Sequence, residues 1–346
     1  MKLKIFIVAV ITTTAIAFTT KDKNNNDDPC IKLQYYFQLK QKTAATYWKD
    51  FNGKKLYGPM MFYGEQSTYV INANEILLQR IKKLPFSNCL NGVTLNKIAT
   101  PTDTIHLNMQ VDYDEADSSL LYYKNAIASV SDINTAKKFV PNISDTEFWM
   151  AMILHENFHL YQTSHPKFKA CQNTTQEIFQ RDTLLYFYNH LPWYKNSIAA
   201  ENQLITNAID TDISDSAKIY IRTYLEIKKA RQQLIQDTFH TNIAPLEDML
   251  ERSEGIARYM EYCMKRIVKT MPQQIALQSI DSSYHYGTYN NYQRKDDKVM
   301  TGISSQYFYA TGLNLAVLFE KLHINYQTTM YADNRTFNWY LQKYIR

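Results

Sequence analysis

The chain has 346 residues, of which 45% are hydrophobic and 21% are charged, and its formal net charge is +5. This length suits one or two domains with a sizeable core. Because the lysines and arginines are scattered and the sequence contains no nucleic-acid-binding module, nothing in it indicates a nucleic-acid partner.

The N-terminus has the pattern of a secretory signal peptide over residues 1–17. Two lysines precede the apolar run Ile5–Ile11, and Ala15–Ala17 forms a small-x-small cleavage site. No later segment approaches the roughly 20 consecutive apolar residues of a membrane-spanning helix. We therefore expect a secreted or periplasmic protein with no membrane span after signal cleavage, and a polar tether over residues 18–29.

The four cysteines are Cys30, Cys89, Cys171 and Cys263. Their even number and the oxidising compartment expected for an exported chain favour disulfides. We expect Cys30 to pair with Cys89 and Cys171 with Cys263, because each pair then stays within one of the two regions described next. Four buried free thiols are the alternative.

Residues 30–140 form a region with mixed signals. Apolar and polar residues alternate over Ile105–Tyr113, which is the period-2 pattern of a half-buried strand. Shorter strands are expected over Tyr57–Tyr63 and Ser67–Ile71, with Gly64 in the turn between them. This region is therefore predicted to be α+β, with a small sheet.

Helical spacing dominates residues 141–346. Ser144 and Glu147 form a capping box, so a helix should begin there and stop before Pro166. The fold class predicted for the whole chain is α+β, with a mixed N-terminal region followed by a mainly helical catalytic region. The further helices expected are Thr175–Asn189, Ser214–Phe239, Pro245–Lys269 and Gln306–Leu322.

The helix that begins at the capping box contains the pentapeptide His155-Glu156-Asn157-Phe158-His159. Residues four apart lie on one helix face, so the two histidines can bind one zinc ion. Glu156 is turned about 100° away, where it can act as general base on a zinc-bound water. A surface helix with two solvated histidines is the alternative interpretation.

A catalytic zinc site needs a third protein ligand, and the sequence offers two main candidates. His165 completes the ligand spacing of metzincins, but Gln162 stands where that clan has a glycine at a sharp turn. Glu254 lies at the edge of the apolar stripe of a later helix, where the small residues Gly255 and Ala257 allow close helix packing. We favour Glu254, with His165 in reserve.

Two further interpretations of the Glu254 helix stay open. Glu261 is a second carboxylate on that helix and is the reserve ligand of the same type. Alternatively, the acidic residues of this helix form only a solvated face.

The His-Glu-x-x-His motif followed by Ser-Glu-Gly-x-Ala at residues 253–257 resembles the gluzincin metallopeptidases. The aminopeptidase branch of that clan carries Asn-Glu-Gly-Phe-Ala. The resemblance implies that both histidines and Glu254 bind zinc and that Glu156 is the base. Ser253 departs from the asparagine of that branch, the interval from His159 to Glu254 is longer than usual there, and the resemblance covers only these two motifs.

Zinc hydrolases commonly add a hydrogen-bond donor for the oxyanion that forms during hydrolysis. Tyr309 is the expected donor, because it opens a segment similar to the helix that follows the last ligand in several such families. Tyr307 and His285 are alternatives. Since the chain has 27 tyrosines, a purely structural role is also open for any one of them.

These patterns together predict an exported zinc metallohydrolase that acts on a peptide or protein substrate. Glu156 favours catalysis, because a purely structural zinc site has no use for a carboxylate between the two histidines. Two alternatives remain: a non-catalytic protein of the cell envelope with a vestigial zinc site, and a zinc hydrolase of a non-peptide bond.

Overall fold

The computed structural model describes residues 29–53, 59–64, 67–73, 75–99, 110–112, 127–179, 182–297 and 302–346. The expected signal peptide and nearly all of the expected tether lie outside these residues. Pro29, which the sequence assigns to the tether, is instead the buried first residue of a helix, a position that suits proline because its missing N–H would have no partner there.

The protein has an α+β fold, as expected. Its strands are β1 (Met60–Tyr63), β2 (Thr68–Ile71), β3 (Leu95–Ile98), β4 (Gln110–Asp112) and β5 (Ile127–Ser131). Short 3-10 turns occur at η2 (Lys49–Asn52) and η5 (Arg294–Asp296), and η4 (Glu251–Gly255) is a π-helical turn. The α-helices are α2 (Pro29–Tyr47), α3 (Glu75–Arg80), α4 (Ile133–Phe139), α5 (Thr146–Thr163), α6 (Pro166–Ile178), α7 (Asp182–His190), α8 (Pro192–Asp210), α9 (Ser214–Phe239), α10 (Ala244–Leu250), α11 (Ile256–Val268), α12 (Ile275–Ile280), α14 (Phe308–Lys321) and α15 (Phe337–Ile345).

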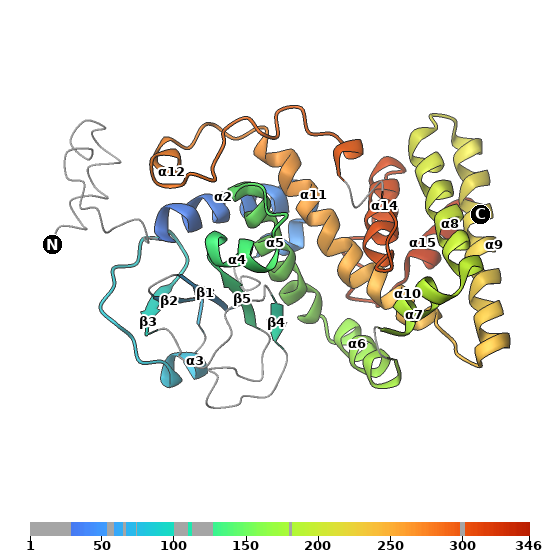
Figure 1. Ribbon diagram of the computed structural model, residues 1–346, viewed down its shortest axis with the longest axis horizontal. Coiled ribbons are helices and arrows are strands. Elements are labelled where there is room, and N and C mark those ends of the chain that lie inside the picture. Colours follow the sequence, from blue (N-terminus) through green and yellow to red (C-terminus); the bar gives the residue numbers. More distant parts are fainter. Residues whose placement is uncertain are drawn as a thin grey trace.

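Figure 1 shows the sheet at one end of the molecule and the pair α8 and α9 at the other, with α5 and α11 between them. Helix α5 packs along α11, and α14 packs against η4, α8 and α11. Every regular element in the described part of residues 141–346 is helical, which agrees with the expectation for this region. Within the described chain, no helix is both long enough and apolar enough to cross a membrane.

The strands form one mixed sheet in the order β3-β2-β1-β5-β4, in which β1 runs parallel to β5 and the other neighbouring pairs are antiparallel. The hairpin of β1 and β2 confirms two of the expected strands, and the Gly64 amide donates to the Ser67 carbonyl (3.0 Å) in the turn. Of the expected strand Ile105–Tyr113, only β4 lies within the described residues. The rest falls outside them.

Both faces of the sheet are covered, which explains why β1 and β2 are buried throughout. Alternate side chains point to opposite faces. Phe62 belongs to the main core and packs edge-on against Trp149 of α5, while Met61 belongs to a smaller cluster on the other face. The Trp149 indole N–H also donates to the Ser131 carbonyl at the end of β5 (3.0 Å). The sheet thus gives α5 a rigid support.

Helix α5 begins one residue later than a Ser144 cap would place it. Asp145 is the N-cap, because its carboxylate accepts from the Phe148 amide (2.8 Å), and Ser144 donates instead to that carboxylate (2.6 Å). Ser144 is therefore not the cap, since the longer-reaching acceptor next to it takes this position. The helix ends at Thr163, before Pro166, as expected.

The other helix predictions have mixed outcomes. Ser214–Phe239 is confirmed at both ends, and Gln306–Leu322 and Pro245–Lys269 are confirmed within one or two residues, although η4 interrupts the latter. The single helix expected over Thr175–Asn189 is wrong. The chain forms α6 and α7 there, since the backbone at Phe179 is extended.

One of the two expected disulfides is present. Cys30 and Cys89 are bonded, whereas Cys171 and Cys263 are free thiols. The second pairing is wrong because the two side chains occupy different environments: Cys171 Sγ lies 3.7 Å from Arg252 Nη2, and Cys263 is buried in the main core.

Candidate metal centre

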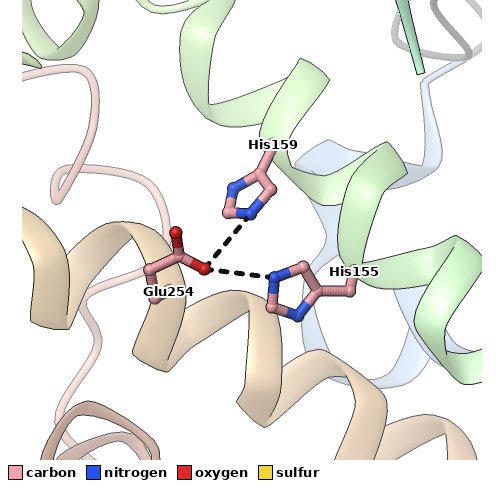
Figure 2. A group of neighbouring side chains, drawn as sticks. All are labelled: His155, His159 and Glu254. Carbon is pink, nitrogen blue, oxygen red and sulfur yellow. Dashed lines mark hydrogen bonds and ion pairs between the residues drawn. The ribbon is translucent and has the colours of Figure 1, made fainter. Parts of the chain in front are cut away.

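Three side chains from two packed helical segments converge on one point between α5 and η4 (Figure 2). Glu254 Oε2 lies 3.3 Å from His155 Nε2 and 3.6 Å from His159 Nε2. The two imidazole rings are 4.7 Å apart and nearly perpendicular, at 83°. One ligand atom from each residue lies within 4.8 Å of the others, so this group could hold a metal ion.

The chemistry of the three donors fits zinc. Two imidazole nitrogens and one carboxylate oxygen are a ligand set of catalytic zinc sites, which keep a fourth position open for water or substrate. The side chains of His155, His159 and Glu254 retain 9%, 12% and 13% of their exposure, so the group is enclosed but still reachable from solvent. The expected ligands are therefore brought together.

The remaining nitrogen of each histidine is also engaged. His155 Nδ1 lies 2.7 Å from Glu261 Oε1, and His159 Nδ1 lies 2.7 Å from Gln162 Oε1. Metal-binding histidines characteristically donate their second ring N–H to such an acceptor, which fixes the ring and its tautomer. Both rings are thus held with Nε2 directed to Glu254. Glu261, the reserve ligand, instead orients His155 from its other side.

Basic residues in turn hold Glu261. Arg258, at the start of α11 and one turn after Glu254, donates to Glu261 Oε2. Asp297 lies 3.9 Å from Arg258 Nη2 and 3.5 Å from Lys265 Nζ, so the pair of acids and the pair of bases balance in charge. These contacts restrict the position of the Glu261 carboxylate, which contacts His155 Nδ1.

The turn η4 places Glu254. A π-helical turn carries more residues than an α-helical one, and such turns are frequent at functional sites. Glu251, its first residue, accepts from Lys228 (2.6 Å) and from Thr311 (2.9 Å), and both partners are buried. Gly255 ends the turn against Gly312 of α14. Contacts from α9 and α14 therefore hold the turn.

A buried network of charges continues from η4 into the helical end of the molecule. Arg231 lies between Glu201 and Glu247, with contacts of 2.6 Å to each. Burial raises the pKa of Glu247, but Arg231 and Lys228 overcome this effect and lower it to about 2. Tyr307 donates to Glu247 and is buried, so this alternative oxyanion donor belongs to the network and not to the ligand group.

Tyr309 lies beside the ligand group. Its ring stacks on the His155 ring at a centroid distance of 6.1 Å and an interplanar angle of 29°. The residue is only partly buried. His285, the other alternative donor, is exposed in a turn whose Thr288 amide donates to the His285 carbonyl.

His165, the reserve histidine, lies outside the ligand group. Its Nδ1 donates to the Tyr161 carbonyl (2.9 Å), and its ring packs edge-on against the Tyr161 ring. The residue stands at the cap of α6, just past the end of α5. Because α5 has ended before His165, this residue does not lie on the helix face that carries His155 and His159.

The charges of the group interact strongly. Burial lowers the pKa of His155, but hydrogen bonds to Glu254 and Glu261 overcome it and raise the pKa to about 10. Burial raises the pKa of Glu254, yet its bonds to the two histidines hold it well below the ordinary value. Burial raises the pKa of Glu156 to about 7, although the charges of the two histidines act to lower it. The Glu156 carboxylate therefore interacts electrostatically with both histidines.

Sequence reasoning missed the supporting residues of the site. The sequence-based prediction gives Gln162 no supporting role at the site, although its position three residues after His159 on a helix is a usable signal. Lys228 and Thr311 carry no local signal, because only the fold brings them to Glu251.

Comparisons of the chain with protein-family models, with curated proteins and with solved structures found no match.

Proposed function

We propose that this chain is an exported, gluzincin-type zinc metallohydrolase that cleaves a peptide or related amide bond. The observation that supports it is the arrangement of the two histidines: both Nε2 atoms face Glu254 Oε2, while Glu261 and Gln162 hold both Nδ1 atoms. A metal ion shared by the three side chains accounts for this common orientation. Export rests on the N-terminal sequence pattern alone.

The roles of the residues follow from their places. A bound zinc ion would polarise the scissile carbonyl and lower the pKa of a coordinated water. Glu156 stands next to His155 but outside the ligand set, where it takes a proton from the attacking water and returns it to the leaving amine. Tyr309, stacked on His155, donates a hydrogen bond from its hydroxyl group to the oxyanion.

The test uses the mature, zinc-loaded protein and a mixture of peptides with free and blocked ends. We expect hydrolysis by the native chain, and cleavage positions will show whether it acts at chain ends or inside. Glu156→Gln should keep one equivalent of zinc and lose hydrolysis by about 10²–10⁴-fold. Tyr309→Phe should lower kcat by about 10²-fold with little change in KM.

Glu226→Gln is the matched control, because it removes an exposed carboxylate on α9 and should leave both zinc content and hydrolysis unchanged. Activity retained in metal-loaded Glu156→Gln would contradict the mechanism. Zinc binding without cleavage of any peptide would contradict the substrate class and direct the search to other bonds.

A further inference from the structure

Gln162 connects the two halves of the metal centre through one buried side chain. Its Oε1 lies 2.7 Å from His159 Nδ1. Its Nε2 donates to the carbonyls of Arg252 (3.1 Å) and Ser253 (2.9 Å), which belong to η4, and to the Tyr331 hydroxyl (2.9 Å). The side chain is 1% exposed, so water does not compete for these bonds.

These contacts settle which end of the amide faces the histidine. Backbone carbonyls can only accept, so the end that meets Arg252 and Ser253 must be the NH₂ group. The Tyr331 hydroxyl donates to the Arg252 carbonyl (2.9 Å) and is therefore free to accept from Gln162. Oε1 then faces His159, whose Nδ1 must carry the proton. A metal ion bound between His159 and Glu254 would then meet the lone pair of Nε2, the atom that points to Glu254 in Figure 2.

We propose that Gln162 is a positioning residue that selects the metal-binding tautomer of His159 and ties this ligand to the turn that carries Glu254. The inference rests on the proposed zinc site. The amide oxygen accepts from His159, and the amide nitrogen donates to the backbone of η4. Helix α5 and η4 are thereby joined before any metal arrives, so less ordering is required when zinc binds.

The two ends of the side chain can be tested separately. Zinc dissociation constants would be measured by competition with a chelator for the native chain, Gln162→Met, Gln162→Glu and Tyr331→Phe. Gln162→Met keeps a side chain of similar length but removes both the acceptor Oε1 and the donor Nε2. It should weaken zinc binding by about 10–100-fold. Gln162→Glu keeps an acceptor for His159, and should bind zinc within about threefold of the native affinity while its thermal midpoint falls, because an oxygen then faces two carbonyls.

Tyr331→Phe is the matched control. It removes a hydroxyl from the same carbonyl cluster without touching His159, and should lower the thermal midpoint with little change in zinc affinity. Equal losses of zinc affinity in Tyr331→Phe and Gln162→Met would mean that Gln162 only supports the turn, and would overturn the inference. An unchanged affinity in Gln162→Met would do the same.

A second measurement does not depend on zinc or on hydrolysis. The ¹⁵N chemical shifts of the His159 ring would be measured in the metal-free Glu254→Ala chain, in which no carboxylate competes for the ring proton at Nε2. They should show a protonated Nδ1 when Gln162 is present and a mixture of tautomers when Gln162→Met is added. A ring protonated on Nε2 in the presence of Gln162 would refute the assignment. A chain that binds zinc with this dependence but hydrolyses nothing would disprove the proposed function and leave the role of Gln162 intact.

Discussion

Gly255 and Gly312 lie in direct backbone contact where η4 crosses α14. A Cβ atom added to Gly312 would lie 2.8 Å from Gly255 Cα and still closer to the Glu251 carbonyl oxygen, distances that real Cβ atoms do not tolerate. Both glycines lie within helical segments, where any residue can adopt the backbone conformation. Glycine is therefore required at these positions because it has no side chain, and not because its backbone is more flexible. This crossing sets the distance between the segment with Glu254 and the helix with Tyr309.

We expect Gly312→Ala to reduce the free energy of unfolding by about 1–3 kcal/mol, because the added methyl group must push two helices apart. Urea denaturation followed by circular dichroism measures the loss. Lys229→Ala, at an exposed position of α9, is the control and should change stability by less than about 0.5 kcal/mol. A fully stable Gly312→Ala would show that the crossing is looser than described.

Removal of candidate ligands distinguishes the two proposed third ligands. Glu254→Ala should weaken zinc binding by more than about 100-fold, beyond the cost of losing an outer-shell partner. His165→Ala should keep one equivalent of zinc, because its ring is engaged with Tyr161. Metal analysis after dialysis gives the answer. Zinc retained in Glu254→Ala and lost in His165→Ala would show that His165 is the third ligand, as the metzincin spacing implies.

Glu147 makes the stability depend on pH. The side chain is 2% exposed, and burial, with smaller effects from Asp145 and Asp281, raises its pKa to about 8. Because the folded pKa lies above the unfolded one, its contribution to stability is fully present below about pH 4.5 and is lost as pH rises through about 8. Between pH 6 and 9 the loss should be on the order of 2 kcal/mol.

Glu147→Gln should remove this loss, since the amide does not ionise. The measurement compares the free energies of unfolding of the native chain and the variant at pH 6 and pH 9. The variant should be the more stable of the two at pH 9. An identical pH dependence in both proteins would mean that Glu147 is not the titrating group.

The disulfide between Cys30 and Cys89 ties α2 to the segment before β3 across a sequence separation of 59 residues. Replacing both cysteines with serine should reduce the free energy of unfolding by about 2–4 kcal/mol, through the greater freedom of the unfolded chain. Cys171→Ser is the control and should have a small effect, because that thiol is unbonded. A thiol count of four in the denatured, unreduced native protein would refute the disulfide.

Local patterns were enough to predict several elements and the ligand group. The hairpin of β1 and β2 was predictable from two short strand-forming runs on either side of Gly64, and helix α9 from a helical spacing repeated over its whole length. The convergence of His155, His159 and Glu254 was predictable because helix geometry fixes the first pair and a short motif marks the third residue.

Features made by tertiary contacts could not be predicted in this way. The π-helical turn has no sequence pattern of its own and depends on Lys228, Thr311 and Gly312, which lie far from it in sequence. The pairing of Cys171 with Cys263 failed for a similar reason. Assigning both cysteines to one region says nothing about their distance within it.

The π-helical turn η4 contains one residue more than an α-helical turn, and this residue affects the candidate metal centre differently from the helices on either side. An insertion of this kind lets the helices before and after it keep the faces they would have in an uninterrupted helix, so α10 and α11 need not rotate to accommodate it. Shortening the turn by one residue would therefore leave the register of both flanking helices intact, while Glu254 and the carbonyls of Arg252 and Ser253 would turn by about 100° or less. The candidate metal centre thus depends on one inserted residue, whereas the packing of the helices around it does not.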